Sequence, residues 1–227
     1  MDILVTPLVT IFSGVGLSML IAAPIGAAAS QVGTLIMWAT EQAPLVMGIL
    51  VSVIVGVALT LPISSAAICA ALGLTGLAGG AAVAGCCAQM IGFAVMSYKE
   101  NGVGGLVSQG LGTSMLQMGN IVKNPRIWIA PTLASAITGP LATCVFHFEM
   151  NGAAVSSGMG TCGLVGQIGV YTGWVSDIAA GTKAAITPMD WAAMVLLCFV
   201  LPAVLSVIFC EIERKLGWIK EGDLKLN

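Results

Sequence analysis

Glu149 is the ionisable residue whose position in this sequence most strongly indicates binding chemistry. It lies in the stretch VFHFEMNGAAVSSG, between a long apolar run and a glycine-rich segment, with His147 and Asn151 close by. A carboxylate and an amide suit the hydroxyl groups of a sugar, which both donate and accept hydrogen bonds. An ionisable group at such a place is costly and tends to be functional. An ordinary acid in an interfacial loop is the alternative, and it stays open.

A four-residue pattern, Gly-x-Gly-Thr, occurs twice in surroundings that hold almost no charge. It reads GLGT at residues 110–113 and GMGT at residues 158–161. Glycine lets backbone amides approach a ligand closely, and the broken helices of transporters line their substrate cavities. Close helix packing through small residues is the alternative. The spacing leaves both interpretations open.

Further candidates are uncharged polar residues in these segments and in residues 62–80. Each glutamine among them could hydrogen-bond a ligand or join two helices. The predicted substrate-binding residues are Glu149, Asn151, His147, Gly112, Thr113, Gln117, Gly158, Gly160, Thr161, Gln167, Ser64 and Ser65.

The composition indicates which elements must position these residues. Hydrophobic residues make up 58% of the 227 residues, charged residues make up 8%, and the mean hydropathy is +1.02. Soluble domains are nearer one-quarter charged, and one of this length has too little interior to bury so much apolar surface. We therefore expect one all-α, polytopic membrane domain over residues 1–227, with about six transmembrane helices and one or two glycine-rich re-entrant hairpins.

Runs without Asp, Glu, Lys or Arg define the expected spans, because about 20 apolar residues cross a bilayer core of about 30 Å. The expected helices cover residues 3–21, 45–61, 81–96, 127–148 and 191–210. Residues 62–80 read as a broken or re-entrant helix, and residues 176–190 read as a loop.

Several residues mark expected breaks between these helices. Pro24 and Gly26 are expected to interrupt the first segment, and Glu41 to mark a loop. Asn124 before Pro125 fits a helix start. No basic region precedes the first apolar segment, so we expect a membrane helix there rather than a cleavable signal peptide.

The sequence also argues against several kinds of chemistry. It holds no nucleophile–base arrangement, no phosphate-binding loop and no zinc-type spacing, so no catalytic residue, metal or cofactor is predicted. The seven cysteines lie mostly in apolar runs and read as small packing residues. The net charge of −2 argues against a nucleic-acid partner.

Basic residues near the span ends predict the orientation in the membrane. The charged tail over residues 211–227 holds four Lys and Arg residues, and the loop of Lys123 and Arg126 is also basic. Both are expected in the cytoplasm, so an even number of crossings must separate them. Residues 152–171 are then expected to form a non-crossing re-entrant hairpin, entered from the outer side.

Several long stretches resemble one family. The sequences LTLPISSAAICAALGL, GCCAQMIGFAVMSYKENG, GLGTSMLQMGNIVKNPRIWIAPTLASAITGP, SGMGTCGLVGQIG and GWIKEGDLKL are similar to the EIIC-like membrane permeases of the bacterial phosphotransferase system. Within this family, the chain resembles the branch that includes the perfringolysin regulator of clostridia. Other members are longer before MDILVTPLVT, so the resemblance implies an N-terminally abbreviated member.

The resemblance implies a multi-pass permease of the bacterial inner membrane with a cytoplasmic C-terminus. Such a permease is a homodimer in the lipid bilayer. It carries a sugar to a cytoplasmic IIB partner, which IIA supplies with phosphate, so this chain needs no phosphoryl-transfer residues of its own. Sugar permeases of this kind use a membrane-buried glutamate beside a re-entrant hairpin, and Glu149 is the candidate for that role. An orphan EIIC-like sensor or regulator, without phosphorylation-coupled transport, is the alternative function.

Overall fold

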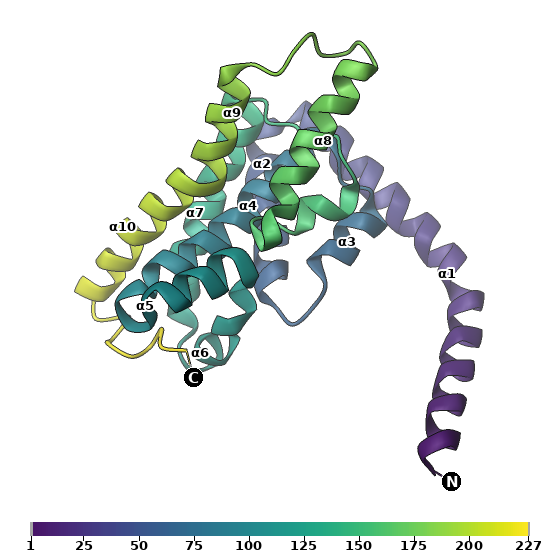
Figure 1. Cartoon of the computed structure of the whole chain (residues 1–227), viewed down its shortest axis with the longest axis horizontal. Helices are drawn as coiled ribbons and strands as arrows, with labels where there is room; N and C mark the ends of the chain where they lie inside the picture. The colour runs from purple at the N-terminus through teal and green to yellow at the C-terminus, as the bar shows by residue number, and fades with distance from the viewer. Residues whose placement is uncertain (1, 227) are drawn as a thin grey trace.

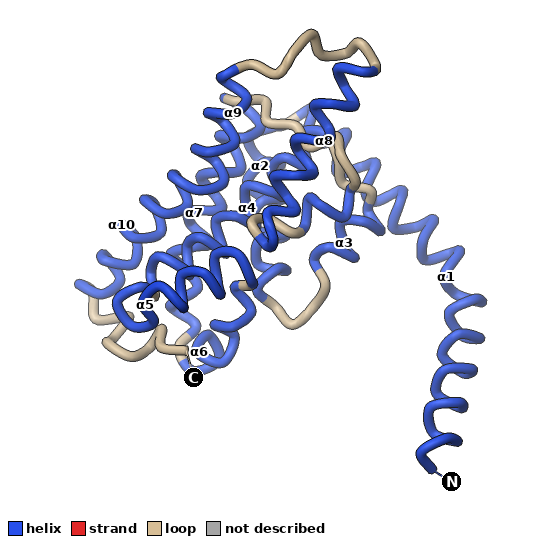
Figure 2. The backbone as a smooth tube through the Cα atoms, viewed as in Figure 1, coloured by secondary structure: helices blue, strands red, loops and turns tan. Residues whose placement is uncertain are grey.

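The chain folds into helices, as the composition predicts. The computed structural model describes the backbone of residues 2–226, and side chains for residues 11, 12, 14, 15 and 26–226. Within these residues there is no β-strand, and one isolated bridge joins Gly76 to Met150 (Figure 2). The expectation of an all-α fold is confirmed.

The helix α4 (Gly76–Met96) lies at the centre of the molecule, with α2 (Pro44–Thr60), α7 (Ile129–Pro140) and α10 (Leu201–Lys215) packed around it (Figure 1). Every residue of α4 from Ala78 to Met90 is buried. Many of them are Gly, Ala or Cys, and such small residues let helix backbones approach closely. A Cβ on Gly56 of α2, for example, would lie 2.7 Å from the carbonyl oxygen of Gly85.

Three helical stretches among the described residues are long and apolar enough to cross a membrane: Gly76–Met96, Pro125–Val145 and Pro188–Lys215. The second joins η3 (Pro125–Trp128), α7 and η4 (Leu141–Val145), and the third joins α9 (Pro188–Val195), η7 (Leu196–Val200) and α10. They match the spans expected at 81–96, 127–148 and 191–210. The Pro44–Thr60 helix is apolar but shorter. The number of about six crossings stays a prediction.

The first helix, α1 (Asp2–Gln42), differs from the expectation. Its backbone is helical past Pro24 and Gly26 and through Glu41, so the expected interruption and the expected loop are both wrong. Neighbouring polar groups and small local adjustments allow proline within membrane helices. The start expected at Asn124 is confirmed, because its side-chain oxygen accepts a hydrogen bond from the backbone N–H of Arg126.

Two helical hairpins, each beginning and ending at one end of the molecule, contain the repeated Gly-x-Gly-Thr pattern. The first hairpin, residues 98–123, consists of α5 (Tyr98–Val107), η1 (Ser108–Gly112), η2 (Ser114–Gln117) and α6 (Met118–Lys123). The second hairpin, residues 152–179, consists of η5 (Ala154–Gly158), η6 (Cys162–Leu164) and α8 (Val165–Ala179). The short α3 (Ser65–Leu72) lies beside η5.

The two hairpins come from opposite ends of the molecule and touch at their tips (Figure 1). Thr161 Oγ1 donates a hydrogen bond of 2.5 Å to the carbonyl oxygen of Gly110, which joins one pattern to the other. The second hairpin has the shape that a re-entrant segment requires, and its position relative to a bilayer stays a prediction.

Candidate functional site

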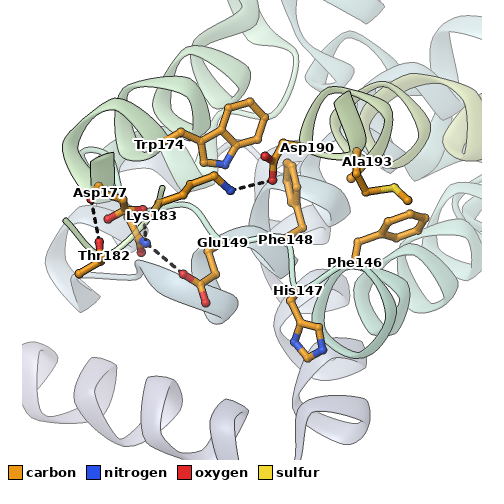
Figure 3. Close-up of a pocket in the computed structure, with 12 residues that line it drawn as sticks. Phe146, His147, Phe148, Glu149, Trp174, Asp177, Thr182, Lys183, Asp190 and Ala193 are labelled. Carbon is orange, nitrogen blue, oxygen red and sulfur yellow. Dashed lines mark hydrogen bonds and ion pairs between the residues drawn. The ribbon is translucent and has the colours of Figure 1, made fainter. Parts of the chain in front are cut away.

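A polar pocket of about 480 Å³ opens at the end of the molecule where the second hairpin begins and ends (Figure 3). Residues 146–151, the end of α8, the loop after it and the start of α9 surround it. We call it the outer pocket. It is lined by Phe146, His147, Phe148, Glu149, Asn151, Trp174, Asp177, Thr182, Lys183, Met189, Asp190 and Ala193.

Glycines of α4 hold the segment that contributes Glu149. Phe148 and Met150 on either side of it are buried, and Met150 exchanges two backbone hydrogen bonds of 3.0 Å with Gly76. A Cβ on Gly80 would overlap the carbonyl oxygen of Phe148. Only glycine therefore lets this segment lie so close to the central helix. The exposed Glu149 side chain lines the pocket and extends from this closely packed backbone (Figure 3).

One amide joins two acids on the hairpin side of the pocket. Asn151 Nδ2 donates to Glu149 Oε2 at 3.0 Å and to Asp177 Oδ2 at 2.9 Å. Asp177 lies on α8, so this pair of bonds also closes the open end of the second hairpin. Each carboxylate keeps lone pairs that can accept from a hydroxyl group in the pocket.

A cation and a third acid also line the pocket. Lys183 Nζ lies 2.8 Å from Asp190 Oδ1 and 5.7 Å from the centre of a ring of Trp174. Asp190 is held by the start of α9, where its other oxygen accepts from the N–H and the hydroxyl of Thr187 in a capping box. Trp174 is nearly buried within the apolar cluster beneath the pocket.

The lining suits a neutral polyhydroxylated ligand. Three carboxylates face one ammonium group, so the pocket is net negative and disfavours phosphate or carboxylate ligands. Carboxylates and the Asn151 amide can bind hydroxyl groups. Phe146 lines the same pocket and is only partly buried, so it offers an apolar surface for the C–H face of a ring. No group of three or more His, Cys, Asp or Glu side chains that could hold a metal occurs among the described residues.

Three of the predicted binding residues, His147, Glu149 and Asn151, come together in the outer pocket. Four of the residues that line it, Trp174, Asp177, Lys183 and Asp190, were not predicted. Residues 176–190 were expected to be a loop, whereas α8 continues to Ala179 and α9 begins at Pro188. A usable signal was present, because Trp174 and Asp177 are three residues apart and so lie near one another on a helix.

Other predicted residues join the second hairpin to its neighbours. Ser65 Oγ donates to the carbonyl oxygen of Gly158 at 2.7 Å, and Ser64 accepts from the N–H of Ala67 to cap α3. Gly160 has a φ of +52° and packs on α4, where a Cβ would lie 2.8 Å from that of Cys86. These positions, like Thr161, have protein partners and do not line the outer pocket.

The predicted residues of the first hairpin also lie away from the pocket. Thr113 caps η2 by accepting from the N–H of Met115 at 3.2 Å, and Gly112 is exposed. Gln117 is fully buried, and its amide bonds to Gln109, Asn120 and the backbone of the tail. Gln167 is buried on α8 beneath the pocket. A substrate contact for these residues stays a prediction.

A second cavity, of about 520 Å³, is apolar. It lies between α1, α2 and α3, and nearly all the side chains that line it are Ile, Leu, Val, Ala or Met. Hydroxyl groups would find almost no partner there. The outer pocket is therefore the better candidate for a polar ligand.

Comparison with known proteins identifies the family of the chain. The family model described as "Phosphotransferase system, EIIC" matches residues 1–226. No curated protein and no solved structure matches the chain. The match spans nearly the whole sequence, and together with the apolar helices it supports a membrane protein with a permease-like role in transport. The chain belongs to the EIIC family of the phosphotransferase system.

Proposed function

We propose that this chain binds a neutral sugar in the outer pocket and carries it across a membrane, for phosphorylation by a separate IIB partner. The observation that carries this proposal is the pairing of Glu149 and Asp177 through the Asn151 amide in the outer pocket. The pocket offers hydroxyl partners and an apolar face, and its negative charge favours a substrate without phosphate. Phosphate would be added after the sugar leaves the pocket.

We infer that the outer pocket faces the side from which a sugar arrives. The tail and the loop of Lys123 and Arg126 lie at the opposite end, where α6 and the tail meet (Figure 1). Basic residues favour the cytoplasmic side. We therefore place this chain in a bacterial inner membrane with its C-terminus inside, as a homodimer served by IIA and IIB components.

Sugar-dependent thermal stabilisation of the purified chain tests the proposal, because a ligand that binds only the folded state raises its unfolding temperature. The panel holds hexoses, hexitols and their phosphates. We expect a neutral compound to raise the unfolding temperature and its phosphate to have little effect. Glu149→Gln should weaken binding about tenfold or more, since a hydrogen bond to a charged group is worth about 1.5–3 kcal/mol.

Glu221→Gln is the matched control, because Glu221 is exposed in the tail, away from the pocket. This variant should bind as the unchanged chain does. Equal affinity in Glu149→Gln and Glu221→Gln would contradict the proposed site. Binding without any transport would instead support the sensor or regulator as the function.

A further inference from the structure

Gln167 differs from the other buried glutamines of this chain in its hydrogen bonding. Its side chain is 6% exposed, and its Oε1 atom has no partner. Its Nε2 atom donates only to a sulfur, Cys87 Sγ, at 3.2 Å. Gln89, Gln109 and Gln117 are fully buried, and both amide atoms of each are paired with oxygen or nitrogen atoms.

An amide oxygen that is buried without a partner is costly, so its presence calls for a ligand or another compensating role. Removal of such a group by an apolar residue of the same shape should not destabilise the fold. Gln89 should behave differently, because its amide oxygen accepts hydrogen bonds from Thr60 and from Trp128.

The position of Gln167 on α8 connects it with the outer pocket. Gln167 and Trp174 are seven residues apart, so they leave the helix on the same face at a separation of roughly 10 Å along its axis. Val170 lies between them on that face and is fully buried. Val170, Trp174, Cys87 and Met150 belong to one apolar cluster. A flexible methionine and a valine are thus part of the layer beneath the pocket.

Gln167 also lies close to the tip of the second hairpin. Its neighbour Gly166 packs on Gly160, where a Cβ would lie 2.5 Å from the Gly160 carbonyl oxygen. Gly160 in turn contacts Cys87, the partner of Gln167. The next residue, Thr161, makes the contact with Gly110 of the first hairpin. Along α8, Gln167 therefore lies between the outer pocket and the contact of the two tips.

We propose that Gln167 forms an inner subsite, in which its Oε1 atom accepts a hydrogen bond from a hydroxyl group of a sugar on its way inward from the outer pocket. This inference rests on the proposed function. The sugar first binds in the outer pocket, and it reaches Gln167 when the side chains of Met150 and Val170 move aside. The unpaired oxygen then gains the donor that the folded chain does not provide.

The test compares Gln167→Met with Gln89→Met. Each substitution removes a side-chain amide and nearly keeps the length of the side chain. The unfolding temperature is measured without sugar, and binding is measured with the hexose and hexitol panel. Exchange of the labelled sugar that binds best is then followed into liposomes that hold the chain and the same unlabelled sugar. In Gln167→Met we expect an unchanged or higher unfolding temperature, nearly unchanged binding in the outer pocket and about tenfold slower exchange.

Gln89→Met should instead lower the unfolding temperature, since it leaves the indole N–H of Trp128 without its acceptor. Exchange by Gln167→Met at the unchanged rate would overturn the inner subsite and leave the outer pocket in place. A fall in unfolding temperature as large as that of Gln89→Met would show that Gln167 is structural. If the unmodified chain binds sugar but does not exchange it, the inner subsite is also overturned. If the unmodified chain binds no sugar, the proposed function itself is overturned.

Discussion

The two hairpins carry the same Gly-x-Gly-Thr pattern, but different interactions hold them. The first hairpin is bound by side chains to the tail: Asn101 donates to the carbonyl oxygen of Leu224 and accepts from the N–H of Leu226, both at 2.8 Å. Glu100 accepts from the N–H of Leu224, and Asn120 donates to the carbonyl oxygen of Lys225. Leu224 itself is fully buried. The first hairpin thus depends on a distant segment.

The second hairpin has close contacts between its own two arms, in addition to its contacts with α3 and α4. Gly166, Gly169 and Gly173 lie along one side of α8 and face residues 151–160 of the other arm. A Cβ on Gly173, for example, would lie 2.8 Å from the backbone nitrogen of Asn151. Close backbone contact of this kind needs no side-chain partners. Polar side chains of the second hairpin are therefore left free to line the outer pocket.

In both hairpins the repeated pattern lies at the tip, but the two threonines have different partners. Thr113 caps a short helix within its own hairpin, whereas Thr161 donates to the backbone of the other hairpin. The pattern provides two tips that can meet. The segments beside the two hairpins differ: the first hairpin binds the tail, and the second borders the outer pocket.

The largest expected effect concerns the dependence of the first hairpin on the tail. Leu224→Ala should lower the free energy of unfolding by about 2–5 kcal/mol, because it removes a fully buried side chain. Thermal unfolding of the purified chain measures the loss. Leu216→Ala is the control, since Leu216 is 57% exposed. Equal unfolding temperatures in the two variants would contradict a tail that stabilises the first hairpin.

A smaller effect should separate the glycines of the two hairpins. Gly152→Ala would place a Cβ against the carbonyl oxygen of Gly169 on the opposite arm, and a shift of the arms to avoid this overlap should cost about 1–3 kcal/mol. Gly112→Ala in the first hairpin meets no atom within 4 Å and should change stability by less than about 1 kcal/mol. A lower unfolding temperature in Gly112→Ala than in Gly152→Ala would contradict this difference between the two hairpins.

The smallest of these effects concerns the contact between the tips. Thr161→Val leaves the carbonyl oxygen of Gly110 without its donor and should cost about 1 kcal/mol. Thr172→Val is the control, because its hydroxyl group bonds only to Gly169 of its own helix and the residue is exposed. Thermal unfolding again measures both. A Thr161→Val variant as stable as Thr172→Val would show that the tip contact adds nothing.

Much of the fold follows from local features of the sequence. Charge-free runs marked the long helices, because a membrane helix must avoid ionised side chains over its whole length. The Asn124-Pro125 start could be predicted, because the cap and the proline act on adjacent backbone groups. The break expected at Pro24 was wrong, since a membrane helix can continue through a proline that a soluble helix would not tolerate.

The candidate site was predicted only in part, because it forms by contacts between distant segments. Glu149 and Asn151 are close in sequence and could be recognised together. Asp177 reaches them only because the second hairpin returns to the same end of the molecule. Lys183 and Asp190 join the pocket through the loop and the capping box that follow. The spacing of residues also could not show that the polar groups of Ser65 and Gln117 form hydrogen bonds within the protein.

The docked tail has a consequence for the order in which the chain is made. Glu100 and Asn101 bond to backbone groups that are 123 to 125 residues later in the sequence. At 5–20 residues per second, a ribosome needs roughly 6 to 25 s to synthesise that length. During this interval the first hairpin holds Glu100, Asn101 and Asn120 without their final partners. A newly made chain must therefore keep these polar groups in water, or bound to a helper protein, until the tail emerges and docks.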